Sequence, residues 1–213
     1  MIIKVCGMRE KENIHQLLEK AAPDLMGLIF YHQSPRFVEK QNELPAFYKT
    51  LPVAKVGVFV NAPMDYILSK INGFALEYVQ LHGDETVEFV RELKAASPIK
   101  VIKVFRIGEE VDWQDLESFE DHVDLFLFDT QTHHFGGSGK QFDWSVLEHY
   151  PFQKEFLLSG GVDQESLDTI NALTIKLPQL IGVDINSKFE IRPGLKDILQ
   201  VSEFVKEMRS RTI

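Results

Sequence analysis

Two residues of this sequence could move protons in one site: Cys6, which ends the apolar run IIKVC, and Asp129, which ends LFLFD. A thiol has a pKa of about 8.5, and nearby positive charge lowers it, so a cysteine can act as a base. A carboxyl group that follows an apolar strand is partly desolvated, which favours the protonated form that a general acid needs. The pair is therefore suited to acid–base catalysis.

Both residues also have structural interpretations. A lone cysteine in a strand is usually a core residue, and Asp129 could cap a helix or hold a loop. Gly7 favours a functional role for Cys6, because it leaves space for a ligand after the strand. Asp184, which ends the run LIGVD, has the same two interpretations as Asp129.

Two glycine-rich turns give a second chemical signal. The segment Gly136-Gly137-Ser138-Gly139 could be a flexible loop by itself, but Gly160-Gly161 follows the next apolar run and leads into a predicted helix. Backbone N–H groups in such turns, together with a helix N-terminus, can hold a phosphate group. The two turns together are more informative than either one, and they indicate an anionic ligand.

Further polar residues follow other apolar runs. Arg36 could hold a carboxylate with its planar guanidinium group, although a surface arginine is the commoner case. His82 is more often a structural hydrogen-bonding residue than a catalyst. The doublet His133-His134 suggests a metal, but adjacent residues do not share a face, and no His or Cys partner stands at ligand spacing. We therefore predict no metal.

Eight short apolar runs alternate with amphipathic stretches, at a spacing of roughly 20–30 residues that suits a strand plus a crossover helix. The runs are Ile2–Cys6, Leu25–Phe30, Lys55–Val60, Leu76–Leu81, Ile99–Phe105, Leu125–Asp129, Glu155–Leu158 and Leu180–Asp184. Runs such as LFLF and YVQL are too continuous for a half-exposed sheet and indicate parallel strands buried on both faces. We predict an α/β fold, a single (β/α)8 TIM barrel over residues 1–213, with a doubly wound open sheet as the alternative.

The stretches between the runs carry helix signals. Asp163 is a predicted N-cap, and Pro63 stands where a first-turn proline is tolerated. Val87, Val90 and Leu93 recur at helical spacing. In a (β/α)8 barrel these helices lie outside, and the active site lies at the C-terminal ends of the strands. The polar residues that follow the runs would then converge on one mouth.

The composition excludes several classes of protein. A formal net charge of −9 argues against a nucleic-acid partner, and it requires that positive charge be gathered locally if the substrate is anionic. No stretch approaches the roughly 18 consecutive apolar residues of a membrane helix, and the N-terminus reads as a strand rather than a signal peptide. One cysteine cannot form an internal disulfide, so we expect a cytoplasmic location.

The motifs form an ordered set over almost the whole chain. They are KVCGM at 4–8, SPRFV at 34–38, VGVFVN at 56–61, QLHG at 80–83, DT at 129–130, GGSGKQFDW at 136–144, LSGG at 158–161, GVDINSKFE at 182–190 and PGLKD at 193–197. None is specific alone, but jointly they resemble the phosphoribosylanthranilate isomerase family of tryptophan biosynthesis. The sequence does not distinguish a monomer from a homodimer.

The resemblance implies a (β/α)8 barrel without a cofactor. It implies an Amadori rearrangement of N-(5-phosphoribosyl)anthranilate to 1-(2-carboxyphenylamino)-1-deoxyribulose 5-phosphate, with Cys6 as general base and Asp129 as general acid. Arg36 would hold the anthranilate carboxylate. The other implied substrate-binding residues lie near the sugar (His82, Asp184) or near the phosphate (Gly137, Gly160, Gly161, Asn186, Ser187).

The sequence departs from the family pattern at two positions. Lys188 replaces a glycine, where it could add charge near the phosphate or, as we expect, point to solvent. Ser138 stands where threonine is common.

Two rival functions also remain at this point. A metal-dependent ribulose-phosphate epimerase would need more ligands than Asn61 and His82 offer after the third and fourth runs. A barrel that only binds a phosphorylated ligand would be expected to lack the cysteine or the aspartate.

Overall fold

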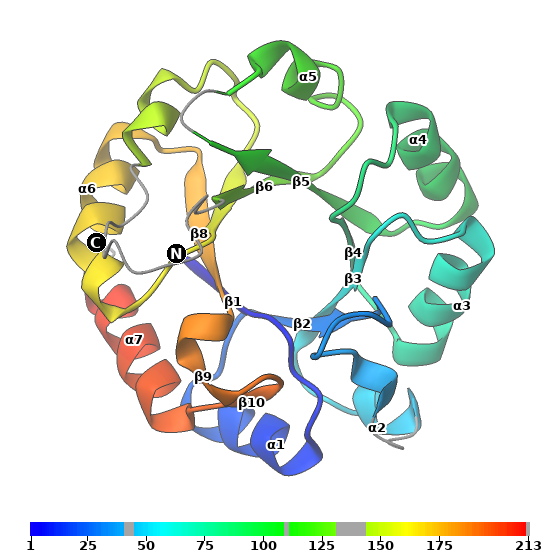
Figure 1. Ribbon diagram of the computed structural model, residues 1–213, viewed down its shortest axis with the longest axis vertical. Coiled ribbons are helices and arrows are strands. Elements are labelled where there is room, and N and C mark those ends of the chain that lie inside the picture. Colours follow the sequence, from blue (N-terminus) through cyan, green and yellow to red (C-terminus); the bar gives the residue numbers. More distant parts are fainter. Residues whose placement is uncertain (41–44, 109–110, 131–143, 212–213) are drawn as a thin grey trace.

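The computed structural model describes residues 1–40, 45–108, 111–130 and 144–211. Its central feature is a closed barrel of eight strands in chain order, surrounded by helices (Figure 1). Every neighbouring pair in the barrel is parallel, including β1 with β8, which closes it. The predicted (β/α)8 barrel is confirmed, and the open doubly wound sheet is excluded.

All eight predicted runs form strands, with shifted ends. The strands are β1 Ile2–Val5, β2 Leu25–Ile29, β3 Ala54–Phe59, β4 Tyr78–Leu81, β5 Lys100–Ile107, β6 Leu125–Thr130, β7 Phe156–Ser159 and β8 Leu180–Ile185. Cys6 follows β1 directly, and its N–H still donates to the carbonyl oxygen of Ile185 at 2.9 Å. Asp129 lies within β6, one residue before its end.

The connections are helical, with several short turns. The α-helices are α1 Lys11–Lys20, α2 Pro45–Lys49, α3 Met64–Phe74, α4 Val87–Ala96, α5 Trp113–Glu117, α6 Leu167–Lys176 and α7 Ile198–Arg211. The 3-10 turns are η1 Val38–Lys40, η2 Trp144–His149, η3 Gln164–Ser166 and η4 Ser187–Phe189, and a hairpin is formed by β9 Glu190–Arg192 and β10 Leu195–Lys196. Within the described ranges, no helix combines the length and the apolar character needed to cross a membrane.

The predicted helix signals mark the starts of helices, although Pro63 lies one residue before its expected position. The Asp163 side chain accepts from the N–H groups of Glu165 and Ser166 in a capping box, so it begins η3, which continues into α6. Pro63 is the N-cap of α3, one residue earlier than a first-turn position. Thr86 caps α4, whose Val90 and Leu93 are fully buried.

Two apolar layers hold the barrel. One layer lies between the strands and the helices, and it contains β1 residues Ile3 and Val5 together with Ile14 and Leu17 of α1. The second takes alternate strand residues and fills the barrel interior (Leu25, Val56, Ile102, Val104, Leu125, Leu127, Leu157). Burial of each such side chain stabilises the fold by about 1.5–3 kcal/mol. Lys4 is at an alternate position of β1, between Ile3 and Val5, so its side chain faces inward.

Gly182 of β8 lies where the barrel closes and has no room for a side chain. A Cβ there would lie 2.4 Å from the Ile2 carbonyl oxygen and 2.8 Å from Cδ2 of Leu157. We expect Gly182→Ala to lower the free energy of unfolding in urea by about 1–3 kcal/mol, because backbone must move to relieve the contact.

Gly73→Ala is the matched control, because a Cβ at this position in α3 meets nothing within 4 Å. It should stabilise the protein by about 0.4–1 kcal/mol, since alanine reduces the entropy of the unfolded chain. Equal stability of the two variants would contradict the packing at the β1–β8 closure.

Candidate active site

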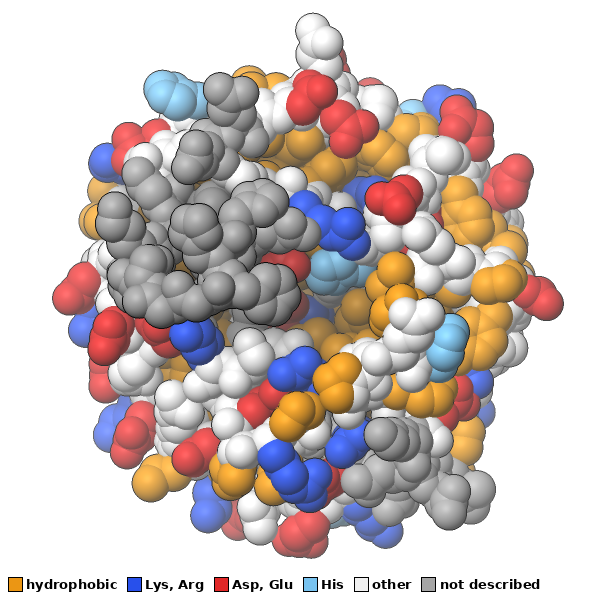
Figure 2. Space-filling model, viewed as in Figure 1, with side chains coloured by type: hydrophobic (Ala, Val, Ile, Leu, Met, Phe, Trp, Pro, Cys, Tyr) orange, Lys and Arg blue, Asp and Glu red, His pale blue; other side chains and the backbone are white. Residues whose placement is uncertain are grey.

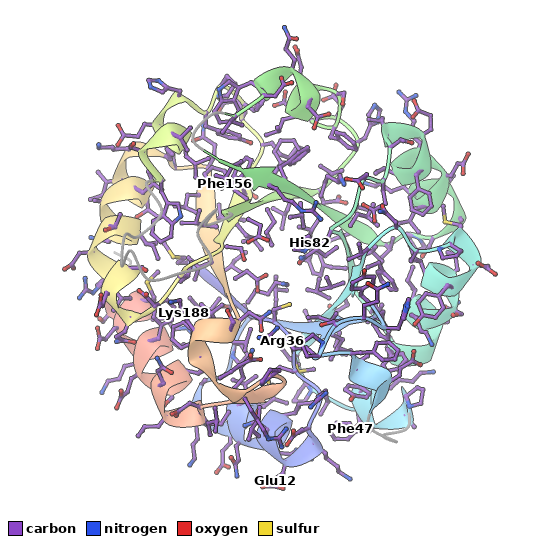
Figure 3. All side chains as sticks on the ribbon, in the orientation of Figure 1. Glu12, Arg36, Phe47, His82, Phe156 and Lys188 are labelled. Carbon is purple, nitrogen blue, oxygen red and sulfur yellow. The ribbon has the colours of Figure 1, made fainter. Side chains whose placement is uncertain are left out.

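A cavity of about 240 Å³ opens at the C-terminal ends of the strands. Predicted site residues from β1, β4, β6, β7 and β8 meet in its lining: Cys6, His82, Asp129, Gly160, Gly161, Asp184, Asn186 and Ser187. Charged side chains and a histidine surround the central hollow of this face (Figure 2). Figure 3 shows His82 toward the barrel interior, with Arg36 and Lys188 on the side of β1 and β8.

Two glycines hold Cys6 at the bottom of this cavity. Gly7 has a φ of +77°, and a Cβ there would lie 2.8 Å from Cδ of Arg36 and 2.9 Å from Oδ1 of Asn186. Gly27 of β2 leaves the space that the cysteine side chain fills, because a Cβ there would lie 2.7 Å from Sγ of Cys6. The thiol is therefore confined by backbone on one side and faces the cavity on the other.

The thiol is in a dry and charged environment. Cys6 is 4% exposed, and burial raises its pKa. The Lys4 and Lys196 ammonium groups lower the pKa of Cys6, whereas the Asp184 carboxylate raises it. Positive charge lies near the thiol, but the desolvation caused by burial is the larger effect, and the pKa of Cys6 is raised.

A buried ion pair lies beneath the cysteine. Nζ of Lys4 is 2.6 Å from Oδ2 of Asp184, and the two side chains are 0% and 5% exposed. Burial lowers the pKa of Lys4, but Asp184 and Cys6 oppose it and the net pKa is raised. Burial likewise raises the pKa of Asp184, against the effect of Lys4. Sequence reasoning missed Lys4, although its position two residues before Cys6 on one strand places both side chains inward.

Asp129 and His82 face each other across the mouth. Nε2 of His82 is 3.2 Å from Oδ2 of Asp129, and both side chains are about a quarter exposed. Nδ1 of His82 is 3.3 Å from Nε2 of the buried Gln80, another residue that sequence reasoning missed. Asp129 is thus oriented by a neighbour and remains open to a ligand in the cavity.

One of the two predicted phosphate-binding turns, Gly160-Gly161, lines the same cavity. Gly160 and Gly161 adopt φ values of +78° and +72° directly after β7. Asn186 and Ser187 follow β8 and complete this side. Lys188 is exposed and also lines the cavity rim, so it both points to solvent and lies beside the turns. Gly137 and the rest of its turn lie outside the described residues, as does His133-His134.

Arg36 is not among the residues that line this cavity; its side chain packs across Gly7 and is already paired. Its Nε and Nη2 donate to the Glu190 carboxylate at 2.6–2.9 Å. Glu190 also accepts from Nζ of Lys196 at 2.8 Å and from the Gly194 N–H. Burial would raise the pKa of Glu190, but Arg36 and Lys196 hold it below its ordinary value. Arg36 therefore has one Nη group with no partner in the described chain, and this group could receive a ligand carboxylate.

A larger cavity of about 510 Å³ lies beside the mouth, between the β4–α4 and β5–α5 segments. Of the predicted site residues it contains only His82, and its buried Lys103 and Glu85 are bonded to each other at 3.1 Å. The smaller cavity is the better candidate, because it holds both the thiol and the carboxyl group. Among the described residues, no group of three or more His, Cys, Asp or Glu side chains is placed to hold a metal ion.

Comparisons with known proteins agree on one family. Residues 3–207 match the family model of N-(5'phosphoribosyl)anthranilate (PRA) isomerase. An N-(5'-phosphoribosyl)anthranilate isomerase of Phocaeicola vulgatus is 46% identical over 211 residues, which cover 99% of each chain. The crystal structure of phosphoribosyl anthranilate isomerase from Thermotoga maritima has a TM-score of 0.79 and 31% identity, covering 99% of this chain and 100% of that one.

A further solved relative contains a ligand. It is a phosphoribosyl anthranilate isomerase in complex with reduced 1-(o-carboxyphenylamino)-1-deoxyribulose 5-phosphate. Its TM-score is 0.76 and its identity 28%, with 99% of this chain and 100% of that chain covered.

The position of Lys188 makes a phosphate-binding test possible. We expect Lys188→Ala to weaken the binding of inorganic phosphate about two- to fivefold, measured by calorimetry at low salt, because an exposed charge contributes little. Lys176→Ala is the control, since Lys176 is exposed on α6 and pairs with Glu148. If both variants bind phosphate with the same affinity, Lys188 makes no contribution to phosphate binding and only contacts solvent.

Proposed function

Because the chain belongs to the N-(5'-phosphoribosyl)anthranilate isomerase family, we propose that it rearranges N-(5-phosphoribosyl)anthranilate with Cys6 as general base and Asp129 as general acid. Enzymes of this family are aldose–ketose isomerases of tryptophan biosynthesis. The product is 1-(2-carboxyphenylamino)-1-deoxyribulose 5-phosphate. Family membership removes the epimerase and the pure binding protein as rivals.

The observation that carries this proposal is the convergence of Cys6 and Asp129 on one cavity. They come from β1 and β6, which are not neighbours in the barrel, so a substrate between them can meet both groups at once. The solved relative with a reduced product analogue supports a phosphorylated anthranilate sugar as the substrate class.

Asp129 begins the reaction as an acid. Its proton goes to the ribose ring oxygen, the bond between C1 and that oxygen breaks, and the lone pair of the anthranilate nitrogen forms a C1=N bond. The open-chain iminium makes the C2 proton acidic. His82, 3.2 Å from the carboxylate, orients Asp129 and stabilises the negative charge left after the transfer.

Cys6 then acts as the base. Its thiolate takes the C2 proton, and the electron pair of the C2–H bond forms C1=C2 while the C=N pair returns to nitrogen. The resulting enol becomes the C2 ketone as C1 gains a proton and the C2 hydroxyl loses one. Apart from the proton transfers with Asp129 and Cys6, every bond that is made or broken lies in the substrate, and the electrons balance within it, so the reaction needs no cofactor. The two groups start in opposite protonation states, as acid–base sites at neutral pH require.

The remaining residues would hold the two anionic ends of the substrate. Gly160 and Gly161, with Asn186 and Ser187, would bind the phosphate through backbone N–H groups and short side chains, and Gly137 is proposed to join them. Arg36 would bind the anthranilate carboxylate, either through its unpaired Nη group or by exchanging Glu190 for the substrate. His82 and Asp184 would lie along the sugar between these ends.

We also propose that the protein acts in the cytoplasm. The single cysteine supports this location, because the chain cannot form an internal disulfide.

The roles of Cys6 and Asp129 are tested by isosteric substitutions. Cys6→Ser and Asp129→Asn should each lower kcat by about 10²–10⁴-fold, because each removes one proton-transfer group. The loss of anthranilate fluorescence during substrate turnover gives the rate.

Asp168→Asn is a matched control, since Asp168 is 91% exposed on α6 and pairs with Arg211. Its turnover should equal that of the unmodified enzyme. Undiminished turnover in Cys6→Ser or Asp129→Asn would remove that residue from the mechanism.

A further inference from the structure

We propose that Lys4 is a positioning residue that stabilises the Cys6 thiolate, and that its ammonium group is shared between Cys6 and Asp184. The proposal deepens the role given to Cys6 above and rests on it for turnover, but its physical content can be tested in the ligand-free protein. Lys4 touches no part of a ligand, because it is fully buried and absent from the cavity lining.

The geometry places Lys4 between two acids. Lys4 and Cys6 are alternate residues, so both face the barrel interior, and the β1–β8 register sets Lys4 opposite Asp184. Nζ of Lys4 donates to Oδ2 of Asp184 at 2.6 Å, and its charge lies close enough to the Cys6 thiol to lower the pKa of that thiol. One ammonium group thus serves a carboxylate and a thiol, all within a region that is at most 5% exposed.

Asp184 uses only one of its oxygens for this pair. Oδ1 is buried and has no hydrogen-bond partner among the residues that the structure describes, while the side chain lines the cavity. A hydroxyl group of a bound sugar could donate to this oxygen. Such a bond would draw negative charge toward the ligand and leave more of the Lys4 charge available to Cys6.

Other charged groups around Cys6 are less able to take this role. Lys196, from β10, already donates to Glu190 and to both the side chain and the carbonyl of Asn186. Arg36 packs across Gly7 and is held by Glu190. The His82–Asp129 pair faces Asp184 and acts on its charge. Among these groups, Lys4 lowers the pKa of Cys6 most, and it shares its charge with a second acid, Asp184.

Sharing has a consequence that a purely structural lysine would not produce. The Lys4 ammonium lowers the pKa of Cys6, and the Asp184 carboxylate raises it. Removing the ammonium should therefore make the thiol harder to ionise. Removing the carboxylate charge should make it easier, both by ending the repulsion and by freeing Lys4 to pair with sulfur.

The chain has one cysteine, so a thiol titration reports on Cys6 alone. Thiolate absorbance in the ultraviolet would be followed against pH in the full-length protein, with Cys6→Ser as the blank that subtracts tyrosine ionisation. The midpoint should rise by about one pH unit or more in Lys4→Met and fall in Asp184→Asn, since an adjacent charge shifts a pKa by about 1–3 units.

Lys55→Met is the matched control. Lys55 is also a buried lysine, 4% exposed, but its ammonium group donates to the carbonyl oxygens of Leu51 and Val53. Its loss should leave the Cys6 midpoint unchanged. A midpoint that stays constant in Lys4→Met, or that moves in the same direction in Lys4→Met and Asp184→Asn, would overturn the proposal.

A folding defect in Lys4→Met does not remove the test. The double variant Lys4→Met/Asp184→Asn leaves no unpaired charge, and its midpoint should lie above that of Asp184→Asn by the shift due to Lys4. No difference between these two variants would again overturn the proposal. Failure of the catalytic role is a separate result: normal turnover in Cys6→Ser rejects Cys6 as the base, whatever the titration of the thiol shows.

Discussion

Barrel closure between β1 and β8 is the constraint on which the site depends. This pairing joins the first strand of the chain to the last strand of the barrel and sets Lys4 against Asp184. Two buried charges cost several kcal/mol each unless they are in contact and hydrogen-bonded, so this register is strongly preferred. A slip of β1 by one residue would turn Lys4 away from Asp184 and into the apolar layer beneath the helices. The same register fixes the end of β1 and so places Cys6 in the cavity.

The inside of the barrel is divided along its axis. Apolar side chains fill one part, and titratable groups gather at the other, where the strands end. The whole chain carries a net charge of −9, yet the ammonium groups of Lys4 and Lys196 and the Arg36 guanidinium lie around the thiol. The placement of these cations thus gives the cavity a local positive potential, which the net charge of the chain does not provide and which the binding of an anionic substrate requires. Burial makes these charges effective, and it also makes the thiol difficult to ionise.

Much of this arrangement could be predicted from the sequence, because strand periodicity is local. Alternation and apolar runs located all eight strands, and the ends of those strands then placed Cys6, Asp129 and the Gly160-Gly161 turn at one mouth. The partners of the site could not be predicted in the same way. Lys4 meets Asp184 across 180 residues of chain, and Arg36 meets Glu190 across 154, so neither pair leaves a local pattern.

The local environment of a group was also beyond sequence reasoning. Nearby positive charge lowers the pKa of a thiol, whereas at Cys6 burial outweighs the charges of Lys4 and Lys196 and the pKa is raised. The resemblance to a family supplies the role proposed for Cys6, and the structure adds the charged groups that surround the thiol.

The central claim is that the Cys6 thiolate removes a proton from the substrate. The most direct measurement compares the pH profile of kcat/KM with the ultraviolet titration of the thiol in the same ligand-free enzyme. Because kcat/KM reports the ionisation of the free enzyme, one limb of the profile should coincide with the Cys6 midpoint and be absent in the residual activity of Cys6→Ser. A profile with neither limb at that midpoint, or with the same limb retained in Cys6→Ser, would contradict the account.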